Sequence, residues 1–126
     1  MTFNIGGTNM KVLKSNIENI DNEKKLIYMM TKGTRTAFKD LTDEDLDQVW
    51  PVDAYLIYED TSSDGSTVNT MISILSGHRI IGGQSKPFIE SFKEIIDIME
   101  NDPISIHVNK RVSKQQRSYY TATLDC

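Results

Sequence analysis

Basic residues gather near the C-terminal end of a chain that is acidic as a whole. The chain has 14 Lys and Arg, 18 Asp and Glu, and a formal net charge of -4. The segment 110–117 nevertheless contains four bases and no acid: Lys110, Arg111, Lys114 and Arg117. Such cations bind phosphate oxygens, and local potential rather than net charge steers an anionic ligand. The alternative interpretation is a solvated loop whose bases only increase solubility.

Flat side chains that can stack on nucleobases accompany these cations. Tyr119 follows Arg117 by two residues, so both side chains share one face of an extended strand. Tyr55 and His107 occupy outward positions in other expected strands. Stacking combined with phosphate contacts is how proteins bind single-stranded nucleic acid. The candidate binding residues, including two bases of an earlier loop, are Lys32, Arg35, Tyr55, His107, Lys110, Arg111, Lys114, Arg117 and Tyr119.

The chain lacks the residue sets that metal and catalytic centres require. His78 and His107 are its two histidines, and its one cysteine is Cys126, so neither a multi-Cys zinc site nor an intramolecular disulfide can form. No dinucleotide-binding or Walker-type glycine motif is present. The segment 82–85 ahead of an expected helix indicates a turn and a cap more than an anion site. We therefore predict no enzyme, no cofactor and no metal.

The elements that must position these residues are mostly strands. Short apolar or alternating segments predict strands at 25–31, 52–59, 68–81, 104–109 and 117–124. Asp64-Gly65 is a tight-turn dipeptide, which predicts that the second and third of these strands form a hairpin. The first nine residues, which include Gly6-Gly7, predict a flexible arm ahead of an ordered domain.

Two helices are expected. Ser85 is a suitable N-cap for a helix that ends at Asp102-Pro103 and carries one apolar stripe: Phe88, Phe92, Ile95, Ile96 and Met99. Thr42, three residues before Asp45, predicts a cap for a short acidic helix at 43–49. We assign five aromatic residues to the core: Tyr28, Tyr58, Phe88, Phe92 and Tyr120. Trp50 is left with two interpretations, pinning the short helix to the domain or stacking on a base.

The order of elements predicts the fold class. Three strands, a helix and two strands, with a helical insertion in the first loop, follow the order of the OB-fold, a five-stranded barrel. Two-layer α+β sandwiches share this order. We therefore predict a mainly β protein with a flexible arm at 1–9 and a single OB-like domain at 10–126. Short apolar runs and the lack of a signal-peptide pattern predict a cytoplasmic protein with no membrane segment.

Four stretches of the chain, spread over residues 24–125, resemble small single-stranded-DNA-binding proteins of phages that infect Gram-positive bacteria. They are 26–33, 54–61, 88–92 and 113–120. The resemblance implies a non-sequence-specific protein, without a cofactor, that coats displaced single strands during DNA replication in the host cytoplasm. Carried over residue by residue, it implies binding roles for Lys32, Tyr55, Lys114, Arg117 and Tyr119.

A second interpretation uses the acidic segment instead. Between Asp40 and Asp47 there are five acids and no base, and such a helix can mimic the charge of DNA. The chain would then be a phage-encoded inhibitor or adaptor that binds a host or defence protein, and the interface would be Asp43, Glu44, Asp45 and Trp50. Fold alone does not choose between the two interpretations. Pairing of hairpin edges would also allow a homo-oligomer.

Overall fold

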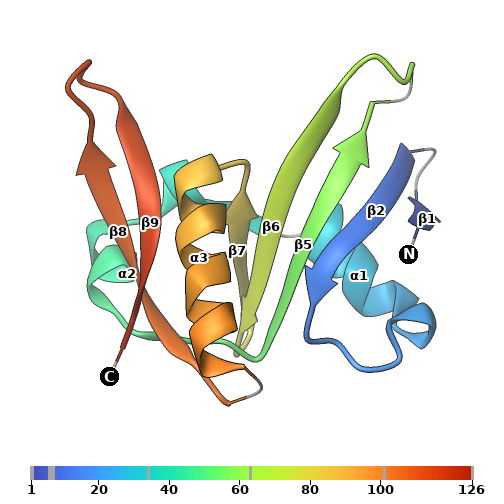
Figure 1. The fold of residues 1–126 in the computed structure, drawn as a ribbon, viewed down its shortest axis with the longest axis horizontal. Helices are drawn as coiled ribbons and strands as arrows, with labels where there is room; N and C mark the ends of the chain where they lie inside the picture. Colours follow the sequence, from blue (N-terminus) through green and yellow to red (C-terminus); the bar gives the residue numbers. More distant parts are fainter. Residues whose placement is uncertain (1, 6–7, 34, 63, 101, 126) are drawn as a thin grey trace.

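Two β-sheets with helices between and beside them make up the computed structural model, which describes residues 2–5, 8–33, 35–62, 64–100 and 102–125 (Figure 1). The larger sheet has six strands in the order β1-β2-β5-β6-β7-β3. Their bounds are β1 Thr2–Ile5, β2 Thr8–Ser15, β5 Ala54–Thr61, β6 Val68–Ser76, β7 Arg79–Gly83 and β3 Arg35–Ala37. Neighbours are antiparallel except β3 and β7, which are parallel.

The smaller sheet is antiparallel, with three strands in the order β4-β8-β9. Their bounds are β4 Trp50–Pro51, β8 Ser105–Val112 and β9 Ser118–Leu124. The α-helices are α1 Lys24–Thr31, α2 Asp43–Asp47 and α3 Lys86–Met99, and two 3₁₀ turns cover Ile20–Asn22 and Phe38–Asp40. None of the helices in the described ranges is both long and apolar enough to span a membrane.

Helix α3 lies between the two sheets and fills the main core. Its N-cap Ser85 accepts a hydrogen bond from the Phe88 backbone N–H. Phe88, Phe92, Ile95 and Ile96 of its apolar stripe are buried, and Met99 is partly buried. The stripe lies in one apolar cluster with inward residues of β5, β6, β8 and β9. Burial of this apolar surface, at about 25 cal/mol per Å², is the main force that joins the two sheets.

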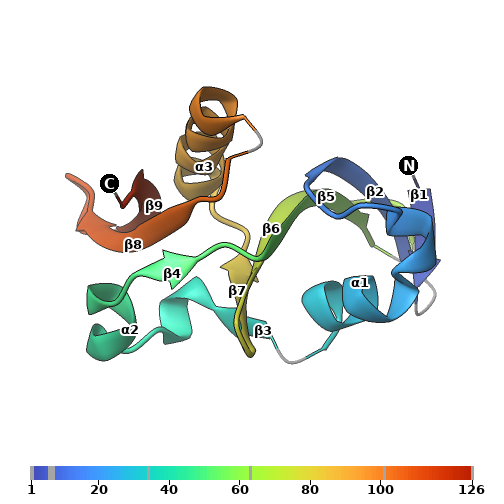
Figure 2. The same ribbon diagram turned by 90° about the horizontal axis from the view of Figure 1, so that it is seen from below.

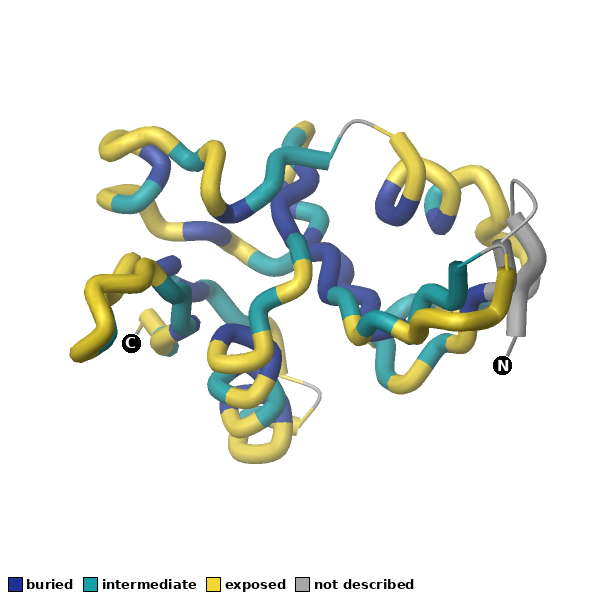
Figure 3. The backbone as a smooth tube through the Cα atoms, turned by 90° about the horizontal axis from the view of Figure 1, so that it is seen from above, coloured by how far each residue is buried: buried dark blue, intermediate teal, exposed yellow. Residues whose placement is uncertain are grey.

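Helix α1 covers the opposite face of the larger sheet, as the view from below shows (Figure 2). Ile27 and Met30 of α1 are fully buried in a second apolar cluster, together with Leu56 and Tyr58 of β5. Strand β5 is therefore covered on both faces, and buried residues concentrate along the middle of the molecule (dark blue in Figure 3).

Several predicted elements are confirmed. The helix after Ser85, the short helix after Thr42 with its capping box, and the hairpin across Asp64-Gly65 are all present. The two C-terminal strands pair as expected, with Ile106 and Val108 inward. The prediction of a mainly β protein with helices is also confirmed.

Two predictions need correction. Residues 25–31 form helix α1 rather than a strand, and Tyr28, assigned to the core, is 51% exposed on the outer side of that helix. The five-stranded OB-like barrel is not confirmed, because the described strands separate into two sheets and close no barrel. After β7 the chain continues directly into α3. This helix lies between the two sheets, where a closed barrel would need strands that pair with each other. Residues 2–5, part of the segment predicted as an arm, form β1, paired with β2, and the division into an arm and a single domain stays a prediction.

Candidate nucleic-acid interface

The β8–β9 hairpin places polar, aromatic and basic side chains on one surface. Side chains alternate between the two faces of a strand pair, so the inward positions of Ile106 and Val108 turn their neighbours outward. Directly opposite each other on the outer side are three pairs: His107 and Thr123, Asn109 and Thr121, Arg111 and Tyr119. We call these six residues the outer hairpin face. The Asn109 amide donates to Thr123 Oγ1 at 3.0 Å, a diagonal bond that links two neighbouring cross-strand pairs.

The hairpin ends in a turn closed by local hydrogen bonds. Ser113 N–H donates to the Arg117 carbonyl at 2.8 Å, and Gln116 N–H donates to the Ser113 carbonyl at 2.9 Å. The Ser113 hydroxyl also accepts from Arg117 N–H at 3.2 Å. These bonds hold Lys114 and Arg117 at an exposed tip that projects away from the cores (Figures 1 and 3).

The four bases of the hairpin carry uncompensated positive charge. Lys110, Arg111, Lys114 and Arg117 are exposed, and none of them forms an ion pair with any acid in the described residues. At the other end of the outer hairpin face, His107 Nε2 lies 2.9 Å from Asp125 Oδ1. Positive potential therefore rises from the base of the hairpin toward its tip, and such a gradient steers an anionic ligand to the tip.

Two of the predicted basic residues lie elsewhere. Lys32, at the end of α1, forms an ion pair with Asp60 at 3.4 Å. Arg35 is half-buried, and its Nη1 donates to Tyr58 Oη at 2.6 Å and to Ser73 Oγ at 3.2 Å. Helix α1 and the β8–β9 hairpin stand at opposite sides of the molecule (Figures 1 and 2). The structure therefore does not bring Lys32 to the hairpin, and it commits Arg35 to contacts within the fold.

The prediction that Tyr55 faces outward is wrong. Its side chain is 7% exposed and meets Phe92 of α3 edge-on, with ring centroids 5.3 Å apart. Burial raises the pKa of the Tyr55 hydroxyl. Because α3 covers this face of β5, Tyr55 belongs to the core and offers no ring for a nucleobase.

Two of the four predicted partner-binding residues make contacts that stabilise the fold around the acidic segment. Asp45 closes the capping box by accepting from Thr42 N–H at 3.0 Å, and it also accepts hydrogen bonds from the Arg79 guanidinium. The Arg79 hydrogen bond, followed by that from the Thr42 backbone, lowers the pKa of Asp45 from 3.8 to about 2. Asp45 is therefore a structural carboxylate.

Trp50 has the first of its two predicted roles. Its side chain is 1% exposed, and its Nε1 donates to the Asp45 carbonyl at 2.9 Å, which pins α2 beside β4. The Arg79 guanidinium carbon lies 4.9 Å from the ring centroid. Of the predicted partner-binding residues, Asp43 and Glu44 are the two that remain exposed.

Sequence reasoning missed part of the outer hairpin face. Thr121 and Thr123 add hydroxyl groups beside Asn109, and their positions two and four residues after Tyr119 are the signal that would have found them. Within the described residues, no group of three or more His, Cys, Asp or Glu side chains is placed to hold a metal ion.

No family model, no curated protein and no solved structure matches the chain.

Proposed function

We propose that this protein binds single-stranded DNA without sequence specificity through the β8–β9 hairpin, in phage-type DNA replication. The observation that carries the proposal is the set of four exposed bases, with no acidic partner among the described residues, beside an outer face that presents Tyr119. Proteins that bind single strands combine a positively charged surface along the nucleic-acid backbone with aromatic rings that stack on the bases.

Each part of the hairpin has a role in this proposal. Lys114 and Arg117 at the tip bind phosphates, which gives affinity without reading sequence. The Tyr119 ring stacks on an unpaired base, and Arg111, directly opposite in register, brings its guanidinium to the same place. Asn109 and its threonine neighbours offer hydrogen-bond donors and acceptors to sugars and base edges.

That the domain is OB-like is part of the same proposal. In such domains an exposed antiparallel surface bordered by basic loops receives the nucleic acid. The outer hairpin face with its basic tip has this character, although it belongs to a separate three-stranded sheet. Phage replication as the setting follows from the resemblance of the sequence.

Fluorescence anisotropy of a labelled oligo-dT strand tests the proposal. The strand should have about 30 nucleotides, well above the ~4–16 nucleotides that one small binding domain covers. Arg111→Glu with Arg117→Glu should weaken binding at least tenfold, because two attractions become repulsions. Lys24→Glu with Lys25→Glu makes the same change of charge on α1, where both residues are exposed, and should leave binding nearly unchanged.

Three results would refute the proposal. Retained binding in the Arg111 and Arg117 variant would remove the hairpin from the site. Equal loss in the α1 variant would mean that net charge, rather than the hairpin, governs affinity. No binding by the folded wild-type protein at low salt would exclude the function itself and leave the exposed Asp43 and Glu44 for tests against protein partners.

A further inference from the structure

Strand β6 has an open edge along its first half. It pairs with β5 from Val68 to Leu75, but with β7 only from Ile72 to Ser76. The cause is that the chain leaves β7 at Gly83 and turns into α3. The β5–β6 hairpin therefore extends beyond β7, and among the strands that the structure describes, residues 68–71 have a neighbour on one side alone (Figure 1).

The backbone groups on this open side can be assigned from the pairing. Ser62 N–H donates to the Thr67 carbonyl at 2.8 Å, so the odd-numbered residues of β6 direct their backbone groups to β5. The even-numbered residues direct theirs to the β7 side, where the Ile72 carbonyl oxygen lies against Gly82. The N–H and C=O groups of Val68 and Thr70 therefore point to the open edge, without a strand partner among the described residues.

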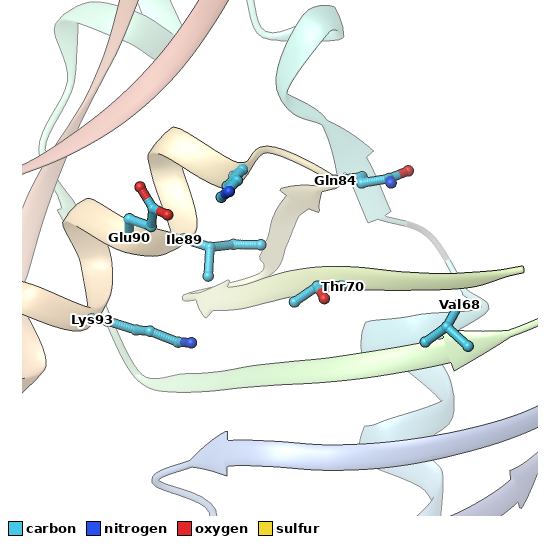
Figure 4. A pocket seen from close by; sticks show the side chains of 7 residues that line it. Val68, Thr70, Gln84, Ile89, Glu90 and Lys93 are labelled. Carbon is cyan, nitrogen blue, oxygen red and sulfur yellow. The ribbon is translucent and has the colours of Figure 1, made fainter.

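A groove runs between this edge and α3, with a volume of about 400 Å³ (Figure 4). Its walls come from β6, the β7–α3 connection and the first turns of α3: Val68, Thr70, Gln84, Lys86, Ile89, Glu90 and Lys93. Val68 is 54% exposed, and Ile89 gives the groove an apolar floor. Lys86 and Lys93 outnumber the one acid, so the groove favours negatively charged side chains.

We propose that the open edge of β6 binds an extended segment of a partner protein as an added strand, with apolar and acidic residues in turn at every second position, on the face turned to α3. Unpaired strand edges are templates for such addition, in which main-chain hydrogen bonds give affinity and alternate side chains give specificity. Because every second side chain of an added strand faces α3, the apolar ones on that face would contact Val68 and Ile89, and an acidic one two positions away would contact Lys86 and Lys93. A peptide main chain repeats N–H donors and C=O acceptors that match those of the open edge. The backbone of a nucleic acid has no such repeat, so a peptide fits this edge better.

The size of the edge sets the character of the interaction. Four residues at about 3.3 Å each give an edge about 13 Å long. Contacts over so short a length suit weak and reversible binding. This edge belongs to the larger sheet and the proposed DNA site to the smaller one, so the two proposals are independent.

Two substitutions at Thr70 test the proposal with a matched control. Thr70→Pro removes the N–H on the open edge and leaves the hydrogen bonds to β5 intact, because proline is tolerated where the N–H faces solvent. Thr70→Val keeps the N–H and nearly the same shape. The probe is a labelled six-residue peptide, Val-Thr-Asp-Thr-Val-Thr, which places Val and Asp on one face and is called the Asp-Val peptide; about six residues is a usual strand length. Wild type and Thr70→Val should bind it, and Thr70→Pro should bind it at least tenfold more weakly.

Two further measurements keep the test decisive if Thr70→Pro unfolds, which a thermal melt will reveal. N-methylation of one alternate set of peptide amides should abolish binding to the wild type, and methylation of the other set should not, because one edge of the peptide faces β6. Lys86→Glu with Lys93→Glu should reverse the preference at least tenfold, from the Asp-Val peptide to a Lys-Val peptide.

Several outcomes would overturn the proposal. One is no binding of the Asp-Val peptide by the wild type, and another is equal binding by the two Thr70 variants. A dimer in sedimentation that Thr70→Pro disperses and Thr70→Val does not would assign the edge to a second copy of this chain. Weaker oligo-dT binding in the Lys86 and Lys93 variant, with no peptide binding, would assign the groove to nucleic acid.

Discussion

The salt dependence of DNA binding can be worked out from the β8–β9 hairpin. For a single strand, each phosphate neutralised by the protein contributes about -0.7 to the slope of log K against log salt concentration. If each of the four exposed bases of the hairpin engages one phosphate, the slope is about -2.8. Affinity for oligo-dT should then fall about 50-fold between about 50 and 200 mM salt.

Removing half of these charges should halve the slope. Lys110→Gln with Lys114→Gln keeps side-chain length and polarity but removes two cations, so we expect a slope of about -1.4 and a fall of about sevenfold over the same range. Lys24→Gln with Lys25→Gln on α1 is the control and should keep the wild-type slope. Anisotropy titrations at several salt concentrations measure all three proteins.

Two results would refute this reasoning. A wild-type slope near zero would mean that stacking alone holds the strand and that the cations are not in contact with phosphate. A wild-type slope that stays unchanged in the Lys110 and Lys114 variant would place the phosphate contacts on another surface. A thermal melt of each variant establishes that the compared proteins are folded.

Three further predictions concern single side chains. Tyr119→Ala should weaken oligo-dT binding by about 1–3 kcal/mol in the same titration, and Tyr119→Phe should not, because the ring does the stacking. Trp50→Ala should lower the free energy of unfolding in urea by about 3–5 kcal/mol, since a fully buried ring is lost. The pKa of Asp45, about 2 when folded against 3.8 ordinarily, is depressed, so its stabilisation is complete above pH 4 and is lost as pH falls toward 2. Asp45→Asn should therefore melt below the wild type at pH 7 and approach it at pH 2.

Elements with local signals could be predicted from the sequence. Ser85 and Thr42 each accept a hydrogen bond from a backbone N–H three residues later. Such a cap marks the start of a helix. The Asp64-Gly65 turn likewise determines a hairpin through residues that are adjacent in the sequence. These features depend on neighbours in the chain, which is why they are visible without knowledge of the tertiary structure.

Helix α1 has no such signal. Its N-cap, Glu23, makes no side-chain capping bond, and the first turn has no acid. A short apolar run suits a strand or a helix equally well. The buried residues of α1 are Ile27, Met30 and Thr31, at the spacing of one helical face. Packing against the second face of β5 therefore selects the helix, and that face is unknown from the sequence.

The rule that side chains alternate between the two faces of a strand predicted the outward residues of the β8–β9 hairpin, but it failed at β5. The rule assumes that one face of a strand meets water. Strands β8 and β9 meet this condition, so the inward Ile106 and Val108 correctly place Arg111 and Tyr119 outward. Strand β5 lies between α1 and α3, and all its residues from Ala54 to Tyr58 are buried. Tyr55 was therefore turned toward a helix rather than toward solvent.

This difference also makes the proposed DNA site separable from the fold. The bases of the hairpin lie outside both apolar clusters, so their substitution should change stability by no more than about 0.5 kcal/mol. The strand that carries Arg111 is nevertheless fixed by its own residues Ile106 and Val108, which are buried in the main core. The backbone that carries the outward side chains is thus fixed before any ligand arrives, which reduces the ordering cost of binding. Loss of DNA binding in hairpin variants would consequently report lost contacts rather than lost folding.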